Sequence, residues 1–308
     1  MLSLSFTSEL PDGFPATAVA IGKFDGLHLG HQQLIHELVE YAHESELAPA
    51  VVTFDRHPMA LFDPVNCPKS ILGQTQKARL IEKLGVEVLL TLEFDRALSQ
   101  LSPEEFVVNH LVPLGASMVF VGENFSFGAG GEGTFSDLRD LGAKYGFRAR
   151  EVAHVELAGK KISSTDIRTA LELGKVELAS LLLGRNHEVT GVIEHGKKLG
   201  RTFGFPTANF SRNSEGYLPQ DGIYAGYLLV DGEAMPAAHS VGTNDSVAEV
   251  PRLLESHVIG RDDLDLYDRE ATAVFVAQVR GWQKFDSLDD LIEQIGKDVQ
   301  VAANLLGE

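Results

Sequence analysis

The first half of the chain alternates short apolar runs with segments in which apolar residues recur at helical spacing. Strand-like runs such as "ATAVAIG", "PAVVTF", "VEVLLTL" and "ASMVFVG" are separated by helical patterns such as "HQQLIHELVEYA", "TQKARLIEKLG" and "SPEEFVVNHLV". Alternation of this kind is typical of βαβ units. It predicts a parallel sheet with helices on both faces.

The second half has a different pattern of apolar and polar residues. Two helical segments end at Gly184, and residues 187–280 then contain strand-like runs such as "HEVTGVIEHG", "GIYAGYLLVDGEAM" and "ATAVFVAQVR", with turns between them. This pattern predicts an antiparallel β-rich domain that closes into a small barrel. A final helix is expected in the tail, where Ser287 and Asp290 have the spacing of a capping box. We therefore expect two domains, residues 1–184 and residues 185–308.

Composition limits the classes of function. The 308-residue chain has a formal net charge of −18 and both halves are acidic, so we expect no nucleic-acid partner. The single cysteine, Cys67, excludes an internal disulfide and suits a reducing compartment. Neither a cationic leader nor an apolar run of the roughly 20 residues that span a membrane is present. We expect a cytoplasmic protein without a membrane partner, either a monomer or a weak homo-oligomer.

The stretch "IGKFDGLHLGHQQLI", residues 21–35, indicates an anion site, because it combines a strand, a tight turn and a helix start. The first N–H groups of a helix have no internal partners and lie at the positive end of its dipole. His28 and His31 have a spacing that places both imidazoles on one helix face. A zinc pair and two solvated histidines are the alternatives. Asp25 has either a chemical role or that of a helix cap.

A second candidate phosphate site is "KKISSTDIR", residues 160–168. Its hydroxyls and its guanidinium gather at a helix start, where they would suit a pyrophosphate. Ser163, Ser164 and Thr165 are also ordinary capping residues, so this segment alone does not decide between the two interpretations.

Two other segments come close to nucleotide-binding motifs. "GAGGEG" at 128–133 satisfies GxGxxG, the pattern of a dinucleotide-binding oxidoreductase, but it follows the fourth strand-like run instead of the first. "GVIEHGKK" at 191–198 ends in Lys198 where a P-loop needs Ser or Thr. We expect neither to be a nucleotide site.

The stretch "GKKLGRTFGFPTANF" gives the second half a glycine-rich loop that carries Lys197, Lys198 and Arg201. These cations either form a phosphate-binding site or lie on a solvated loop. The strand-like "PTANF" then places Thr207 and Asn209 on one face. Hydroxyl and amide oxygens are hard ligands that Mg²⁺ accepts together with substrate phosphates, although a polar strand edge has the same pattern.

Taken together, these motifs resemble a known family. An HxGH followed by "ISSTDIR" is similar to the nucleotidyltransferase signature, and the chain from about residue 17 to residue 304 resembles the bacterial bifunctional riboflavin kinases and FMN adenylyltransferases. The family's TFxPHP and GxxFxFG stretches are matched by "TFDRHP", in which Arg56 replaces a proline before His57, and by "GENFSFG". The resemblance implies a Rossmann-like α/β nucleotidyltransferase domain followed by a riboflavin kinase-like β-barrel with a terminal helix.

For the first domain, the resemblance implies residues that bind ATP. Gly22, Phe24 and Asp25 would shape the nucleotide pocket. The residues that would contact ATP phosphates or pyrophosphate are His28, His31, Asn124, Ser164, Thr165 and Arg168. The attacking FMN phosphate is already ionised, so catalysis would need positioning, cations and Mg²⁺ and not a general base.

For the second domain, "PTAN" and "PQDGIY" at 219–224 resemble riboflavin kinase motifs. The resemblance implies Thr207 and Asn209 as Mg²⁺ ligands and Glu255 as the base that accepts the proton of the ribityl 5′-hydroxyl. One departure is "GTNDSV" at 242–247, where Asp245 replaces a family proline. The residues that would bind ATP or flavin are Gly196, Lys197, Gly200, Arg201, Gly204, Pro206 and Asn209.

The expected activity is phosphorylation of riboflavin to FMN and adenylylation of FMN to FAD, each with MgATP, so that riboflavin, FMN and ATP are the small-molecule partners. One alternative is an FMN adenylyltransferase whose kinase half has decayed at "GTNDSV" into a flavin-binding regulatory module. Another is a monofunctional nucleotidyltransferase for a different substrate.

Overall fold

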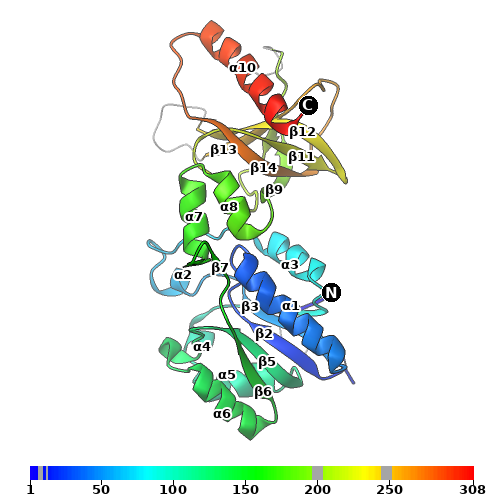
Figure 1. Ribbon diagram of the computed structural model, residues 1–308, viewed down its shortest axis with the longest axis vertical. Helices are drawn as coiled ribbons and strands as arrows, with labels where there is room; N and C mark the ends of the chain where they lie inside the picture. Colours follow the sequence, from blue (N-terminus) through cyan, green and yellow to red (C-terminus); the bar gives the residue numbers. More distant parts are fainter. Residues whose placement is uncertain (6–9, 12, 196–203, 244–251) are drawn as a thin grey trace. The chain divides into compact units, whose positions relative to one another are not determined.

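The structure is a computed structural model that describes residues 1–5, 10–11, 13–195, 204–243 and 252–308. Two compact units are present: residues 1–70 with 74–163, and residues 71–73 with 164–308 (Figure 1). Helices α7 (Ser164–Glu172) and α8 (Val176–Leu183) therefore belong to the second unit. The expected division of the chain into domains of residues 1–184 and 185–308 stays a prediction.

The first unit is built on a parallel sheet. Among its described residues, six strands are ordered β1-β4-β3-β2-β5-β6, and every neighbouring pair is parallel. The predicted alternation is confirmed, although β1 and β6 were not among the strand-like runs that the pattern identified. The strands are β1 (Leu2–Leu4), β2 (Thr17–Ile21), β3 (Ala48–Phe54), β4 (Val88–Leu92), β5 (Ala116–Gly122) and β6 (Arg148–Val152).

Helices cover both faces of this sheet. Val19 and Val121 belong to a core cluster that includes Phe106 and Leu138 of the helical segments on one face. Phe120 points the opposite way along its strand and packs edge-on against Tyr41 of α1. The helices of this unit are α1 (Leu29–Glu44), α2 (Met59–Phe62), α3 (Gln74–Lys83), α4 (Arg96–Ser99), α5 (Pro103–Phe106), the π-helix η2 (Val107–Leu111), the short 3-10 helix η3 (Ala129–Gly131) and α6 (Phe135–Tyr145).

The strand order creates a switch point at β2. The chain leaves β2 toward β3 on one side and returns later to β5 on the other side. At such a point, ligands bind beyond the carboxyl ends of the strands. The register pairs Ala20 with Phe120, so Gly22, directly after β2, and Gly122, the last residue of β5, lie at neighbouring strand ends. A small hairpin of β7 (Glu156–Leu157) and β8 (Lys160–Lys161) completes the unit.

The second unit contains the predicted antiparallel barrel, closed in the order β10-β13-β12-β11-β14-β9. The hairpin between β11 and β12 turns at Asp231 and Gly232, whose φ angles of 49° and 86° suit a two-residue turn that matches strand twist. The strands are β9 (His187–Glu194), β10 (Ala208–Phe210), β11 (Gly222–Val230), β12 (Glu233–Gly242), β13 (Leu253–Val258) and β14 (Glu270–Gly281).

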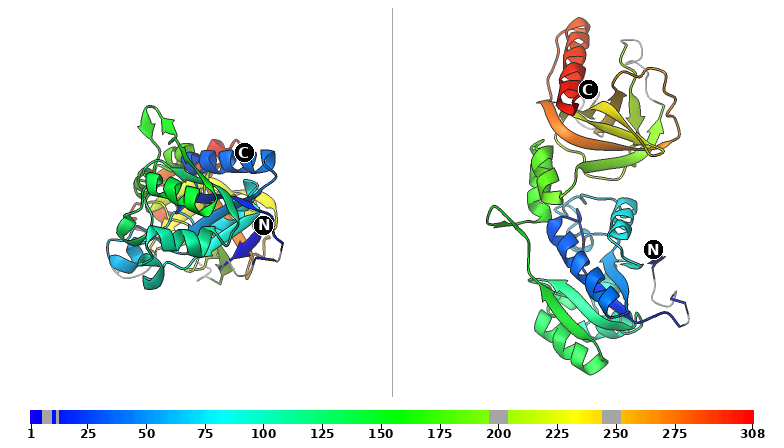
Figure 2. Two further views of the ribbon diagram at one scale, coloured as in Figure 1. Left: turned by 90° about the horizontal axis from the view of Figure 1, so that it is seen from below. Right: turned by 45° about the vertical axis from the view of Figure 1, so that its right-hand side comes forward.

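The terminal helix α10 (Leu288–Leu306) lies along the outside of the barrel (Figure 2). The predicted cap is confirmed, because the Ser287 hydroxyl accepts a hydrogen bond from Asp290 N. Ala302 packs against Ala225 and Ala238 of the barrel wall. Asp298, only 3% exposed, accepts hydrogen bonds from Arg280 of β14 at 2.7 to 3.0 Å and from Gln294 at 2.8 Å. The charged pair thus ties α10 to the barrel.

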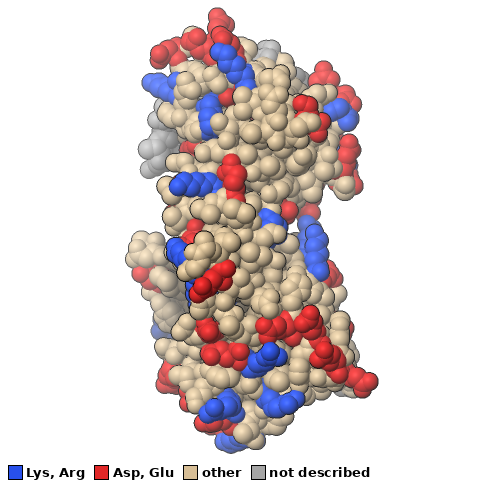
Figure 3. Space-filling view, in the orientation of Figure 1, with Lys and Arg blue, Asp and Glu red and all other residues tan. Residues whose placement is uncertain are grey.

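Charged side chains of both signs lie on the face of the molecule that Figure 3 draws. On the face drawn in Figure 3, acidic side chains are distributed widely and Lys and Arg side chains lie singly or in small groups among them.

None of the described helices is long and apolar enough to span a membrane. "GAGGEG" forms a short 3-10 turn that ends before α6, and none of its glycines lies in the first turn of that helix, unlike in a dinucleotide fingerprint. Residues 191–194 of the P-loop-like segment lie within β9.

The Arg280–Asp298 pair predicts a strong contribution to stability. Asp298→Ala leaves the partly buried Arg280 charge without its carboxylate, which is expected to lower the free energy of unfolding by about 3 kcal/mol. Urea unfolding of the full chain, followed by fluorescence of its single tryptophan, Trp282, reports on this unit.

Glu293→Ala is the matched control, because Glu293 forms an exposed ion pair with Lys297 on the same helix. Its expected effect is below about 0.5 kcal/mol. Equal effects of the two substitutions would show that the buried pair does not anchor α10.

Candidate functional site

The turn between β2 and α1 brings the first predicted residues to the carboxyl edge of the sheet. Gly22 N donates to Val52 O at 3.1 Å, which continues the ladder between β2 and β3 by one bond. A Cβ on Gly22 would lie 3.0 Å from the ring of Phe24, tighter than side chains normally pack. Glycine at this position therefore lets Phe24 fold back over the end of the strand.

Backbone strain is concentrated in this turn. Phe24 and Leu27 have φ angles of 49° and 44°, in the left-handed region that bulky residues rarely occupy. Such residues cost on the order of 1 to 3 kcal/mol each and persist only where the surroundings hold them. Here both side chains are buried, at 1% and 2% exposure, and Leu27 O accepts a hydrogen bond from Gln32 Nε2 at 2.8 Å. Burial and hydrogen bonding thus hold the strained conformation.

The two histidines lie against each other. Their ring centroids are 3.7 Å apart with an interplanar angle of 19°, and Phe24 meets His31 edge-on at 5.3 Å. The expectation that both belong to the helix itself needs correction, because α1 begins at Leu29 and His28 precedes it with extended backbone. A Cβ on Gly30 would lie 3.3 Å from the His28 ring, so this glycine makes room for the stack.

The start of α1 is suited to an anion. His28 occupies the N-cap position without a side-chain cap hydrogen bond, and the first turn of this helix contains no acidic residue. Asp25 is not the cap, which corrects that alternative. The helix of 16 residues therefore presents N–H groups and the positive end of its dipole at this edge.

His31 is neutral in this environment. Burial, followed by the positive charges of His28 and Lys23, lowers its pKa well below 6.5. Its Nδ1 is buried and has no hydrogen-bond partner among the described residues. A buried polar atom of this kind is costly unless a ligand or water completes it. In the described part of the chain, no group of three or more metal-ligating His, Cys, Asp or Glu residues is found.

A second turn follows β5. Asn124 has a φ of 63°, and Phe125 N donates to Gly122 O at 3.2 Å to close the turn. Asparagine tolerates this conformation better than most residues. Because β5 is the direct neighbour of β2, the fold brings Asn124 and the turn at residues 22–28 to the same edge of the sheet.

Sequence reasoning missed Lys77 at this edge. Lys77 is only 7% exposed, and its Nζ donates to Thr53 Oγ1 at 3.3 Å and to Phe54 O at 2.9 Å. Burial lowers its pKa to about 8, while Asp25 and Asp55 act in the opposite direction. The sequence offered one indication of this burial. Lys77 lies four residues before the buried Ile81, so both residues fall on the apolar face of α3.

The serine-rich segment lies in the second unit. Helix α7 begins at Ser164, and Arg168 Nη2 lies 3.5 Å from Thr165 Oγ1. The hydroxyls and the guanidinium therefore gather at a helix start, as the sequence predicts. Their part in binding phosphates stays a prediction.

In the barrel, three predicted residues come together. Thr207 precedes β10, and its hydroxyl donates to Glu255 Oε2 of β13 at 3.3 Å. Asn209 and Glu255 are directly paired across the two antiparallel strands. Because Thr207 and Asn209 are two residues apart, they share one face of the strand with Glu255.

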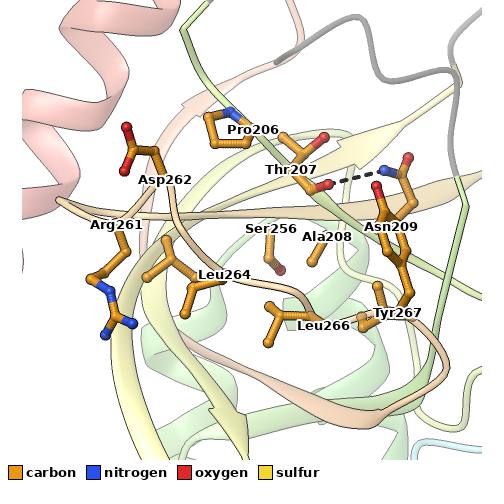
Figure 4. A pocket seen from close by; sticks show the side chains of 12 residues that line it. Pro206, Thr207, Ala208, Asn209, Ser256, Arg261, Asp262, Leu264, Leu266 and Tyr267 are labelled. Atoms are coloured by element: carbon orange, nitrogen blue, oxygen red, sulfur yellow. Dashed lines mark hydrogen bonds between the residues drawn. The ribbon is translucent and has the colours of Figure 1, made fainter.

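A small cavity of about 50 Å³ lies beside these residues (Figure 4). Pro206, Thr207 and Asn209 line it together with Ser256 and Tyr267. Asn209 Nδ2 donates to Thr207 O at 3.2 Å, the dashed line in Figure 4. Gly204 lies just before this segment in the left-handed region, with a φ of 84°.

A buried pair supports the cavity from inside the barrel. His239 and Ser256 are 0% and 1% exposed, and His239 Nδ1 lies 2.7 Å from Ser256 Oγ. Burial lowers the pKa of His239 to about 4, so its ring is neutral. The sequence pattern did not identify this pair, because a histidine within an apolar strand has no local signal for its partner.

Several predicted kinase residues lie outside the described residues. They are Gly196, Lys197, Gly200 and Arg201 of the glycine-rich loop, together with Lys198 and with Asp245 of "GTNDSV".

Comparison with known proteins identifies the family. A family model described as FAD synthetase matches residues 12–166, and one described as riboflavin kinase matches residues 183–306. A bifunctional riboflavin kinase/FMN adenylyltransferase of Escherichia coli K12 is 36% identical over 291 residues, which cover 94% of this chain and 92% of the relative. The chain belongs to this family.

Other members of the bifunctional family show the same extent of similarity. The Bacillus subtilis protein with the same description is 35% identical over 93% of this chain and 91% of its own length. A crystal structure from Streptococcus pneumoniae, described as a macrolide-efflux protein, has a TM-score of 0.88 and 29% identity and covers 98% of both chains. The similarity to both proteins extends over more than nine-tenths of this chain.

The electrostatics predict opposite charge states for two histidines of the first unit. At pH 6.5 we expect His31 to be neutral, because burial disfavours its charged form. We expect His154 to be mostly protonated, because hydrogen bonds to Glu123 and Glu156 raise its pKa. NMR of imidazole ¹⁵N nuclei across pH 5 to 8 measures both.

Substitution of each histidine by glutamine assigns the two signals. A His31 ring that titrates above pH 6.5, or a His154 ring that is neutral there, would contradict this account of the site.

Proposed function

We propose that this chain phosphorylates riboflavin to FMN and adenylylates FMN to FAD, using ATP in both reactions. The observation that carries the proposal is that one chain of the bifunctional family has both a paired-histidine helix start and a Thr207–Asn209–Glu255 cluster. We assign adenylyl transfer to residues 1–184 and the kinase to residues 185–308. Matches of the two families to residues 12–166 and 183–306 support this assignment.

In adenylyl transfer, an FMN phosphate oxygen attacks the α-phosphorus of ATP. The bond from that phosphorus to the bridging oxygen breaks, and pyrophosphate leaves. We assign the ATP phosphates to the start of α1, with the neutral His31 ring and the His28 ring beside it as hydrogen-bond donors. Gly22, Phe24 and Asp25 would shape the nucleotide pocket. Such donors, held in place before the reaction, stabilise charge without reorganisation.

Asn124 at the neighbouring strand end is assigned to the same phosphates, because the fold brings its turn to the same sheet edge. Ser164, Thr165 and Arg168 of α7 keep the role that the family resemblance implies, as a second set of phosphate contacts.

In the kinase reaction, Glu255 accepts the proton of the ribityl 5′-hydroxyl as that oxygen attacks the γ-phosphorus of ATP. The bond from the γ-phosphorus to the oxygen that bridges it to the β-phosphorus breaks, and ADP leaves. Thr207 and Asn209 are assigned to Mg²⁺, and their oxygens fit this ion because they are hard donors on the face shared with a carboxylate. Bound Mg²⁺ would neutralise the charge of the transferred phosphoryl group. ATP and flavin are further assigned to Gly204 and Pro206, together with Gly196, Lys197, Gly200 and Arg201 of the loop.

Replacement of both His28 and His31 by Ala is expected to abolish FAD formation and to leave FMN formation within twofold of the wild type. The reason is that both rings lie in the first unit, whereas the kinase cluster lies in the barrel. Incubation with riboflavin, ATP and Mg²⁺, followed by chromatographic separation of FMN and FAD, measures both activities at once.

His43→Ala is the control, because His43 is exposed in the last turn of the same helix. It should leave both products unchanged. Equal loss of FMN and FAD in the double variant would contradict the division into two sites.

Glu255→Gln is expected to lower the kinase rate by roughly 10²- to 10⁴-fold with little change in substrate binding, because it retains shape but removes the proton acceptor. Steady-state kinase kinetics across a Mg²⁺ titration provide the measurement.

Thr207→Val is the contrasting variant in the same assay. It deletes a proposed ligand oxygen, so it should raise the Mg²⁺ concentration required for half-maximal rate. Near wild-type turnover of Glu255→Gln would show that Glu255 is not the base.

A further inference from the structure

Lys77 is a buried cation at the carboxyl edge of the sheet in the first unit, the edge to which the ATP phosphates are assigned. Its ammonium donates to Thr53 Oγ1 and to Phe54 O, both at the end of β3. A lysine that is only 7% exposed loses most of its hydration, which disfavours its charged form. Its hydrogen bonds therefore replace solvent and fix the position of the ammonium.

These hydrogen bonds continue to the strained turn. Thr53 Oγ1 accepts from Lys77 and donates to Lys23 O at 3.2 Å. Lys23 is the residue directly before Phe24, where the backbone enters the left-handed region. A relay from Lys77 through Thr53 thus holds the carbonyl at the point where the strain begins.

Charged groups surround this ammonium. Asp25 of the turn and Asp55 after β3 raise the pKa of Lys77, and burial outweighs them, so that the pKa lies at about 8. Asp55 is itself paired with Arg56 at 2.6 Å. Lys23 Nζ lies 3.4 Å from His57 Nε2 at the same edge.

We propose that Lys77 is a positioning residue for adenylyl transfer: its ammonium, acting through Thr53 and opposite Asp25, holds residues 22–28 in the conformation that receives the ATP phosphates. This inference rests on the proposed adenylyltransferase activity and adds a residue to it. Lys77 acts through the turn and needs no direct contact with the substrate.

The test compares Lys77→Met with Lys77→Arg in the full chain. Lys77→Met removes the charge and the hydrogen bonds, and it should lower kcat for FAD formation by about 10- to 100-fold, the range that small misplacements of reacting groups produce. Lys77→Arg keeps a cation and should retain at least a third of the wild-type kcat at pH 7. KM for FMN and for ATP, measured alongside kcat, should change less than threefold in both variants.

The pH profile separates positioning from a purely structural role. Lys77 is protonated below about pH 8 and loses its proton above it, so the wild-type rate of FAD formation should fall as the pH rises from 7.5 to 9. Arginine stays charged over this range, so Lys77→Arg should lack the decline, and Lys77→Met should be slow and flat. Asp25, Asp55, Arg56, Lys23 and His57 are the same in all variants, so any decline that they cause persists in each.

Two controls and a second test variant accompany these measurements. FMN formation by the same samples should stay within twofold of the wild type, because the kinase cluster lies in the other unit. Lys83→Met, at an exposed position of the same helix, should leave both activities unchanged. Thr53→Val interrupts the relay but leaves Lys77 in place, and it should also lower kcat for FAD formation.

Several outcomes would overturn the inference. A Lys77→Met enzyme with kcat within twofold of the wild type would do so, as would the same alkaline decline in the wild type and in Lys77→Arg. In either case FAD formation by the wild type leaves the proposed function intact. A wild type that forms no FAD from FMN and ATP would contradict the proposed function and, with it, the role of Lys77.

Discussion

The left-handed backbone at Phe24 and Leu27 is the constraint on which the carboxyl edge of the sheet in the first unit depends. An ordinary turn after β2 would not bury both side chains and also lead the chain into α1 with His28 extended. The cost of this conformation is met by surrounding interactions that are independent of any ligand: burial of two side chains, Gln32 on the carbonyl of Leu27, and Thr53 on the carbonyl of Lys23. The turn is therefore preorganised, which limits the reorganisation that the proposed binding of phosphates requires.

The barrel achieves preorganisation by another route, the register of two short strands. Asn209 and Glu255 face each other because β10 and β13 pair antiparallel with Ala208 opposite Ser256. If β10 were shifted by one residue along β13, Asn209 would point into the barrel and its apolar neighbours Ala208 and Phe210 would point outward. Burial of Ala208 and Phe210 therefore fixes the register of the two strands. The buried His239–Ser256 pair strengthens that choice, because a shifted Ser256 would leave a neutral imidazole without its hydroxyl partner.

Features with local signals were predictable from the sequence. The strand-turn-helix corner, the serine-rich helix start and the PTAN strand are each contiguous, and the apolar periodicity around them indicates the elements that carry them. Thr207 and Glu255 are 48 residues apart, and only the family resemblance brought them together before the structure was known. The spacing of His28 and His31 predicted that they share one helix face, but it did not predict the stack of their rings, because spacing alone does not show that the helix begins after His28.

Long-range polar pairs were not predictable. Arg280 and Asp298, like Lys77 and Thr53, are ordinary charged or polar residues in their own segments, and their importance arises from burial, which depends on the tertiary structure. Lys77 had a weak signal, since a charged residue on the apolar face of α3 conflicts with the periodicity around it. Such conflicts between a local pattern and the fold are expected at functional sites.

The charge states of the first unit fit a site for polyphosphates in an acidic protein. His31 is held neutral by burial and by neighbouring positive charge, so its contribution to an anion is a directional N–H and not a full charge. The positive potential at this edge therefore comes in part from the start of α1. Lys77 has a different part, since it holds the turn, and the opposing effects of burial and two carboxylates leave its pKa at about 8. Lys77 is already desolvated in the folded chain, and its hydrogen bonds to Thr53 and Phe54 take the place of water, so the proposed support of the turn needs no reorganisation of this ammonium.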